Sequence, residues 1–210
     1  MIYNSIVKGR FISRPNRFIA YAEIDGKEEI CHVKNTGRCR ELLIPEADII
    51  LEISDNPNRK TKFDLISVYK NGRLINIDSQ APNKIAAELL PKLFPDYIIK
   101  PEQKYKNSRF DFYLESANKR AFAEVKGVTL ENENIVMFPD APTERGVKHI
   151  NELIQAAENG FDAYILFIIQ MNQVKYLIPN YETHREFGEA LHLAKQKGCL
   201  LYTSPSPRDT

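Results

Sequence analysis

Two carboxylates and one lysine near the middle of the chain have the residue types and spacing of a hydrolytic site. Glu124 and Lys126 are two residues apart in a run, 120–126, that is typical of a β-strand. Because side chains alternate between the faces of a strand, these two share a face and lie roughly 7 Å apart. Asp111 belongs to an upstream run, 109–115, that also predicts a strand. If the two strands pair, the three side chains converge at one sheet edge.

Such a group suits a divalent cation acting on a phosphate. Hard divalent cations prefer oxygen ligands, which two carboxylates on rigid strands supply. A neighbouring lysine can orient water or offset the negative charge that develops on a phosphate. The same residues allow an alternative, a salt-bridged sheet edge in which Lys126 only pairs with Glu124.

The apolar residues between these polar ones predict the face of each strand that is buried. In the downstream run the apolar face consists of Ala121, Ala123 and Val125. In the upstream run Phe110, Phe112 and Leu114 share a face, and Asp111 lies on the opposite one.

Composition sets broad limits on the class of protein. The chain has 210 residues, 43% of them hydrophobic, which is enough for one large domain or two small ones. No apolar run reaches the ~18 residues of a membrane span, and the N-terminus lacks a signal-peptide pattern. The three cysteines are odd in number and lack zinc-finger spacing, so we expect a cytoplasmic protein in a reducing compartment.

Residues 1–80 predict a small β-barrel. Short β-like runs occupy 6–14, 17–24, 28–34, 47–53, 63–68 and 74–77. Asp25-Gly26 and Asn71-Gly72 are hairpin signals between them. A five-stranded OB-like barrel has this size and binds oligonucleotides or sugars on one face.

Residues 81–198 predict a second, α/β domain. Helical periodicity covers 82–94, a segment after Thr143 and 182–197, and Pro91 should shorten or kink the first of these helices. Strand-like runs cover 98–105, 109–115, 120–126, 128–138, 163–170 and 174–179. Strands that alternate with helices indicate a mixed α/β domain.

The last residues, 199–210, do not continue this pattern. Their end, Ser-Pro-Ser-Pro-Arg-Asp-Thr, resembles translated sequencing adapter. We therefore expect a non-native tail, and resequencing of the gene tests this expectation.

Basic residues form three groups in the first 80 residues, and aromatic residues lie near them. The groups are Lys8, Arg10, Arg14 and Arg17; Lys34, Arg38 and Arg40; and Arg59, Lys60 and Lys62. Basic and aromatic side chains on a barrel face suit nucleic acid, through backbone charge and base stacking. The alternative is an ordinary solvated surface. Residues 1–80 contain 13 basic and 11 acidic residues, and the net charge of the whole chain is only +1.

A second basic group lies at the start of the predicted helix after Thr143. Arg145, Lys148 and His149 belong to it. A helix N-terminus favours phosphate, and an arginine can clamp a phosphate with two hydrogen bonds. Helix capping and surface ion pairs are the alternative.

Several segments together resemble the sugar fermentation stimulation protein family. They are 35–38 with Leu42-Leu43, 54–57 with Arg59-Lys60, 83–90, 109–112, 124–126, and 138–146 with Lys148-His149. The segment 138–146 is the most specific of them, and the resemblance covers roughly residues 10–198. It implies an OB-like barrel followed by a domain similar to PD-(D/E)XK nucleases, which are restriction-endonuclease-like, with a mixed central sheet.

The resemblance also implies roles for particular residues. Asp111 matches the first metal-binding aspartate, Glu124 and Lys126 match the Glu-x-Lys positions, and Glu88 matches an additional acid. Family members are described as DNA-binding proteins tied to the regulation of sugar use. A departure from the family's usual residues occurs at Cys39-Arg40, away from these positions.

Together these observations predict a DNA-binding protein with a nuclease-like site that hydrolyses phosphodiesters with Mg or Mn. Asp111, Glu124 and the backbone carbonyl of Val125 would hold the metal. Two alternatives remain open: a non-catalytic DNA-binding regulator of sugar metabolism, and an oligosaccharide- or nucleotide-binding module.

Overall fold

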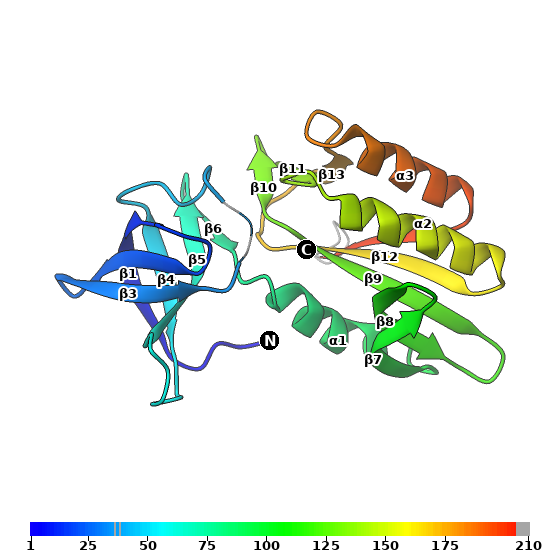
Figure 1. Cartoon of the computed structure of the whole chain (residues 1–210), viewed down its shortest axis with the longest axis horizontal. Helices are drawn as coiled ribbons and strands as arrows, with labels where there is room; N and C mark the ends of the chain where they lie inside the picture. Colours follow the sequence, from blue (N-terminus) through cyan, green and yellow to red (C-terminus); the bar gives the residue numbers. More distant parts are fainter. Residues whose placement is uncertain (36, 38, 205–210) are drawn as a thin grey trace. The chain divides into compact units, whose positions relative to one another are not determined.

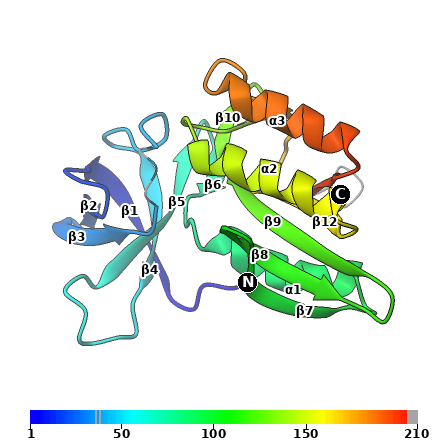
Figure 2. The same ribbon diagram turned by 45° about the vertical axis from the view of Figure 1, so that its right-hand side comes forward.

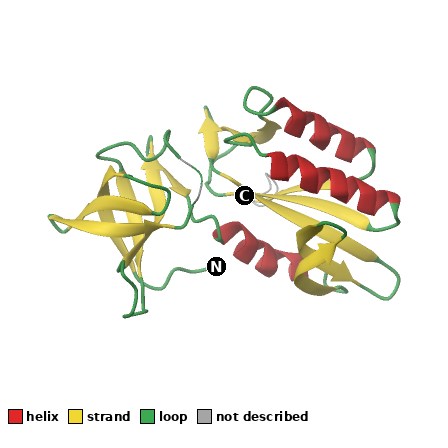
Figure 3. Ribbon diagram, viewed as in Figure 1, coloured by secondary structure: helices red, strands yellow, loops and turns green. Residues whose placement is uncertain are grey.

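A computed structural model of the chain describes residues 1–35, 37 and 39–204 and shows two compact units (Figures 1 and 3). The first comprises Met1–Ala81 with Gln170–Asn172, and the second comprises Pro82–Ile169 with the described residues from Gln173 onward.

The first unit is a β-barrel, as the hairpin signals predict. Its strands are β1 (Ile6–Ser13), β2 (Ile19–Ile24), β3 (Lys27–Val33), β4 (Asp48–Ile53), β5 (Phe63–Lys70) and β6 (Arg73–Asn76). They follow the order β3-β2-β1-β4-β5-β6, and a parallel pairing of β3 with β5 closes the barrel. Asp25 and Asn71 have positive φ and each precedes a glycine with positive φ, the conformation of two-residue hairpin turns.

A buried carboxylate, Asp64, lies where the barrel closes. Only 2% of the residue is exposed, and the Arg59 guanidinium donates to both its oxygens, over 2.8 and 2.6 Å. Lys34 Nζ and His32 Nδ1 each lie 3.0 Å from it. Burial raises the pKa of Asp64, but the hydrogen bonds from these three side chains outweigh it and hold the pKa well below its usual value. The cluster therefore ties β3 to β5 with paired charges.

The second unit is a mixed sheet covered by helices. The strands are β7 (Ile98–Tyr105), β8 (Ser108–Glu115), β9 (Arg120–Val128), β12 (Asp162–Ile169) and β14 (Leu200–Ser204), in the order β14-β12-β9-β8-β7. The pairings β7–β8 and β8–β9 are antiparallel, whereas β9–β12 and β12–β14 are parallel. A smaller sheet contains β10 (Leu130–Asn132), β11 (Ile135–Phe138) and β13 (Tyr176–Pro179).

The helices of this unit lie on opposite faces of the larger sheet. Helix α1 (Ala81–Leu93) covers one face, and α2 (Glu144–Glu158) and α3 (Arg185–Gln196) cover the other (Figures 1 and 2). Burial of both faces explains why β12 is a nearly continuous apolar run, of which only Asp162 is not buried.

Three details of the second unit differ from the sequence prediction. The run 128–138 is a hairpin of β10 and β11, because Glu133 and Asn134 adopt positive φ and reverse the chain. Pro91 lies in the last turn of α1 and does not end the helix before Leu93. Residues 200–204 form β14, paired in parallel with β12, although the sequence predicted no element there. The non-native origin of 199–210 stays a prediction.

All three cysteines are buried and none forms a disulfide. Within the described parts of the chain, no helix has the length and apolar character needed to cross a membrane.

We expect Asp64→Ala to destabilise the first unit by about 3 kcal/mol, because it leaves Arg59 and Lys34 without their buried partner. Urea unfolding followed by circular dichroism measures the loss. The control is Glu46→Ala, which removes only the exposed partner of Arg10 and should change the midpoint little. Equal midpoints for the two variants would contradict the structural role of Asp64.

Candidate active site

The candidate site lies where β8 and β9 separate. Their antiparallel pairing runs from Glu115↔Arg120 to Phe112↔Ala123, so Asp111 and Glu124 are the next residues after it ends. Beyond this point, within the described strands, β8 continues in its pairing with β7 and β9 in its pairing with β12. The backbone N–H of Val125 instead donates to Asp111 Oδ2 over 2.8 Å. A side chain thus replaces the backbone partner that the ladder no longer supplies.

The alternation of β9 places Glu124 on the face opposite Ala123, as the sequence predicts, and there it contacts His149 of α2. Ala121, Ala123 and Val125 belong to the buried cluster that includes Ala86 and Leu90 of α1. Glu124 and Lys126 therefore face the other side of the sheet.

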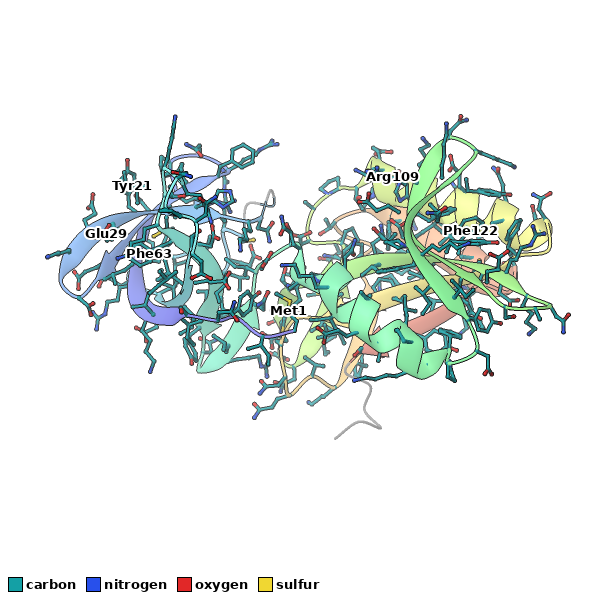
Figure 4. All side chains as sticks on the ribbon, turned by 90° about the horizontal axis from the view of Figure 1, so that it is seen from below. Met1, Tyr21, Glu29, Phe63, Arg109 and Phe122 are labelled. Atoms are coloured by element: carbon teal, nitrogen blue, oxygen red, sulfur yellow. The ribbon has the colours of Figure 1, made fainter. Side chains whose placement is uncertain are left out.

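The predicted common face of Phe110, Phe112 and Leu114 on β8 is wrong at one residue. Phe112 and Leu114 join the α1-side cluster, but Phe110 packs against Phe122 with ring centroids 5.1 Å apart. Figure 4 labels Phe122 within the crowded side chains of this sheet. The change of face lies next to Asp111, where the pairing of β8 with β9 ends.

Glu124 is a buried carboxylate with two donors on one oxygen. Only 3% of the residue is exposed. Lys126 Nζ lies 2.7 Å and His149 Nδ1 lies 2.5 Å from Oε1, whereas Oε2 is buried with no hydrogen-bond partner among the described residues. Burial raises the pKa of Glu124, but the His149 hydrogen bond and the Lys126 charge outweigh it and lower the pKa. The side chain is therefore an ionised carboxylate with one open oxygen.

Asp111 is the second carboxylate, approached from the α1 side. Asn83 Nδ2 donates to its Oδ1 over 2.9 Å, in addition to the Val125 N–H on Oδ2. Burial and the negative charge of Glu124 raise the pKa of Asp111, against the hydrogen bonds from Val125 and Asn83. The two carboxylates thus oppose each other's ionisation, a conflict that a cation near both would relieve.

These donors fit a hard divalent cation. The buried, unpartnered Glu124 Oε2 and the carboxylate of Asp111 are oxygen ligands of the kind that such ions prefer. Among the described residues no group of three or more His, Cys, Asp or Glu side chains could hold a metal ion. A cation here would therefore complete its shell with water, substrate oxygen or a backbone carbonyl, for which Val125 remains the predicted source. Magnesium is often bound by only one or two carboxylates.

A surface cleft of about 470 Å³ lies beside Glu124, separated from it by His149. The β7–β8 turn and the start of α2 line the cleft, with Asn107, Ser108, Arg109, Glu144, Arg145, Lys148 and His149. Thr143 Oγ1 accepts from the Gly146 N–H over 3.1 Å and so caps the start of α2. Arg145 and Lys148 are exposed, as residues that contact a substrate must be.

The structure brings the three predicted catalytic residues together, but it buries one residue that was predicted to contact nucleic acid. Asp111, Glu124 and Lys126 converge, and the Lys126–Glu124 ion pair of the alternative reading is also present. His149, predicted to contact nucleic acid, is 6% exposed and bonds to Glu124. The i+4 spacing of Arg145 and His149 on one helix could have shown their mutual contact, but no local signal shows the contact with Glu124.

Helix α1 contains one residue that was predicted to belong to the site and one that was not. Glu88 is exposed, and its catalytic role stays a prediction. Asn83, which sequence reasoning did not select, is the α1 residue that contacts Asp111. A neutral amide shows no chemical signature in a sequence, so only its position in the fold reveals it.

Some of the basic residues of the barrel make structural contacts, and others are exposed. Lys34 and Arg59 are engaged with Asp64, and Arg14 donates to the carbonyls of Gly37, Arg17 and Asn35, so all three have structural contacts. Arg10 pairs with Glu46, while Arg17 and Lys60 are exposed. Arg38 lies outside the described residues. All of these nucleic-acid contacts stay predictions.

The fold and this site define a class of protein. A barrel is followed by a mixed sheet in which an aspartate and a Glu-x-Lys pair meet at a strand end, as in restriction-endonuclease-like domains behind an OB domain. The family model "SfsA N-terminal OB domain" matches residues 12–77, and the model "Sugar fermentation stimulation protein RE domain" matches residues 80–205. The chain belongs to the sugar fermentation stimulation protein family, as its motifs predicted.

Relatives cover nearly the whole chain. A "Sugar fermentation stimulation protein homolog" of Clostridium beijerinckii is 62% identical over 204 residues, 96% of this chain and 90% of the relative. One of Desulfitobacterium hafniense strain Y51 is 59% identical over 203 residues, 96% of this chain and 89% of the relative. A solved structure of Pyrococcus furiosus SfsA in complex with Ca²⁺ is 30% identical, with a TM-score of 0.85 over 97% of this chain and 89% of that one.

We expect Glu124→Gln to lower the pKa of Asp111, because the substitution removes a negative charge that contributes to the raised value. Carboxyl ¹³C chemical shifts across an acid titration of the metal-free protein measure this pKa. The control is Glu115→Gln, which removes an exposed glutamate paired with Lys100 and should leave Asp111 unchanged. An unchanged Asp111 pKa in Glu124→Gln would show that the carboxylates do not interact.

Proposed function

We propose that this chain binds nucleic acid, DNA first, and hydrolyses phosphodiesters at the Asp111–Glu124 site with Mg or Mn. The observation that carries the proposal is the buried Glu124 Oε2, which has no hydrogen-bond partner in the described parts of the chain and has a second carboxylate nearby. An unsatisfied buried carboxylate oxygen is costly, and a bound cation would satisfy it. The Ca²⁺ in the structure of the Pyrococcus furiosus relative supports a cation in this family.

Each residue of the site has a role in this reaction. A divalent cation, when bound, supplies positive charge that polarises the phosphodiester and favours ionisation of water. Asp111 and Glu124 hold that charge in place, and Asn83 and the Val125 N–H fix the direction of Asp111. Lys126, held 2.7 Å from Glu124, lies close enough to orient the attacking water or to offset the charge that develops on the phosphate.

The cleft beside the site supports a polymeric substrate. Arg109, Arg145 and Lys148 line it and are exposed, and of the described residues that line it Glu144 alone is acidic. A second phosphate of a nucleic acid could bind these cations while the scissile one lies at the carboxylates. Exposed arginines and lysines of the barrel, such as Arg17 and Lys60, would bind backbone phosphates by themselves.

Binding without cleavage is the second candidate, and one observation favours it. Lys126 donates to the same Glu124 oxygen as His149, so its ammonium is already engaged with a carboxylate. A DNA-binding regulator of sugar metabolism would need the cleft and the barrel but no turnover. The cleavage assay below distinguishes the two.

We expect Asp111→Ala and Glu124→Ala each to reduce Mg- or Mn-dependent cleavage at least about 100-fold, because each removes a ligand that places charge at the phosphate. Single- and double-stranded DNA and RNA, incubated across a titration of each metal, identify the substrate. Glu115→Ala is the matched control, since Glu115 is an exposed glutamate on the same strand as Asp111. Residual cleavage equal to that of the wild type would remove the two carboxylates from the mechanism. Absence of cleavage by the wild type, with DNA binding retained, would favour the regulator.

We expect Arg17→Ala and Lys60→Ala to weaken DNA binding and to flatten its salt dependence. Each phosphate contact that is lost should reduce the slope of log affinity against log salt by about 0.9 for duplex DNA. Fluorescence anisotropy at several salt concentrations measures the slope. Lys27→Ala, at an exposed lysine outside the three basic groups, is the control. Binding that does not change with salt would count against a role for the barrel cations.

A further inference from the structure

The hydrogen bonds of His149 connect the exposed cleft to the buried carboxylate. On one side of the ring, Arg145 Nε donates to His149 Nε2 over 3.4 Å. On the other side, Nδ1 lies 2.5 Å from Glu124 Oε1. We propose that His149 is a positioning residue that orients Glu124 toward a divalent cation, and does not itself contact nucleic acid. The inference rests on the proposed function.

Burial excludes His149 from direct contact with a polymer. The residue is 6% exposed, and its ring meets the edge of Phe110 with centroids 6.1 Å apart. The neighbouring Arg145 and Lys148 are exposed, so they are the residues of this helix that can reach a phosphate. His149 thus lies at the inner wall of the cleft with its ring packed toward the sheet, while Arg145 and Lys148 are exposed.

The partners of the ring determine where its proton lies. An arginine can donate hydrogen bonds but cannot accept them, so Nε2 must accept from Arg145. In the neutral ring the proton is then on Nδ1, which donates to Glu124 Oε1. Arg145 therefore selects the tautomer in which His149 is a donor to the carboxylate.

This tautomer leaves one oxygen of Glu124 for a cation. His149 and Lys126 both donate to Oε1, from α2 and from the same strand respectively, so the carboxylate cannot rotate without losing both bonds. Oε2 is left buried, with no hydrogen-bond partner among the residues that the structure describes. Partners of this kind fix the orientation of metal ligands, and their loss typically weakens metal affinity 10- to 100-fold.

The test measures Ca²⁺ affinity by isothermal titration calorimetry, with Ca²⁺ alone as the probe. We expect His149→Ala to bind Ca²⁺ about 10- to 100-fold more weakly than the wild type. His149→Asn should recover most of this affinity, because the asparagine amide nitrogen occupies the place of Nδ1. His149→Gln should not, because its amide lies where Nε2 was. Gln155→Ala, at an exposed residue of the same helix that accepts a hydrogen bond from Lys106, is the matched control and should bind as the wild type does.

A second readout needs no cation. The ¹⁵N shifts of the His149 ring in the metal-free protein should show the Nδ1–H tautomer in the wild type. The Nε2–H tautomer would overturn the inference, as would equal Ca²⁺ affinity in the wild type and His149→Ala. If His149→Ala does not fold, the contrast between the Asn and Gln variants decides, and equal affinities for these two would also overturn it.

These outcomes separate the inference from the proposed function. Wild-type protein that binds no Ca²⁺ would overturn both the cation site and the role of His149 toward it. Wild-type protein that binds Ca²⁺ but gives one of the contrary results above would overturn the role of His149 alone.

Discussion

The separation of β8 from β9 is the constraint on which the site depends. An antiparallel ladder satisfies the backbone groups of both strands, and where it ends these groups need other partners. At this point the Asp111 carboxylate accepts a hydrogen bond from the Val125 N–H. Glu124 is the residue of β9 that follows the last paired one, Ala123, and it lies on the face toward α2. The two acids lie close together because the fold places them on either side of one opening in a sheet.

Burial gives the Glu124 carboxylate its chemical character. A charge in the interior must be paired, and Lys126 and His149 supply that pairing at a single oxygen. They keep the side chain ionised although it is 3% exposed, and they leave its second oxygen unsatisfied. Asp111 experiences the opposite balance, since burial and the charge of Glu124 both disfavour its ionisation. Two neighbouring acids thus have pKa values displaced in opposite directions by their surroundings.

The barrel contains another buried carboxylate, Asp64, whose role is structural. Asp64 uses both oxygens, one toward each arm of the Arg59 guanidinium, and Lys34 and His32 complete its surroundings. A carboxylate satisfied at both oxygens holds strands together and has no capacity left for a ligand. The contrast with Glu124 indicates which buried acid is structural and which has an oxygen available for chemistry.

The sequence by itself determined the strands of the barrel, most elements of the α/β domain, and the choice of Asp111, Glu124 and Lys126 as candidate site residues. These follow from local periodicity, turn residues and spacing, which need no knowledge of distant neighbours. The hairpin within 128–138 and the strand 200–204 were missed, because a backbone reversal at non-glycine residues and a long-range parallel pairing leave weak local signals. Only the tertiary structure decided that Phe110 changes face, that Asn83 supports Asp111, that His149 belongs to Glu124, and that Lys34 and Arg59 belong to Asp64. The partners in these contacts are up to 30 residues apart, and a side chain's role depends on which group the fold places against it.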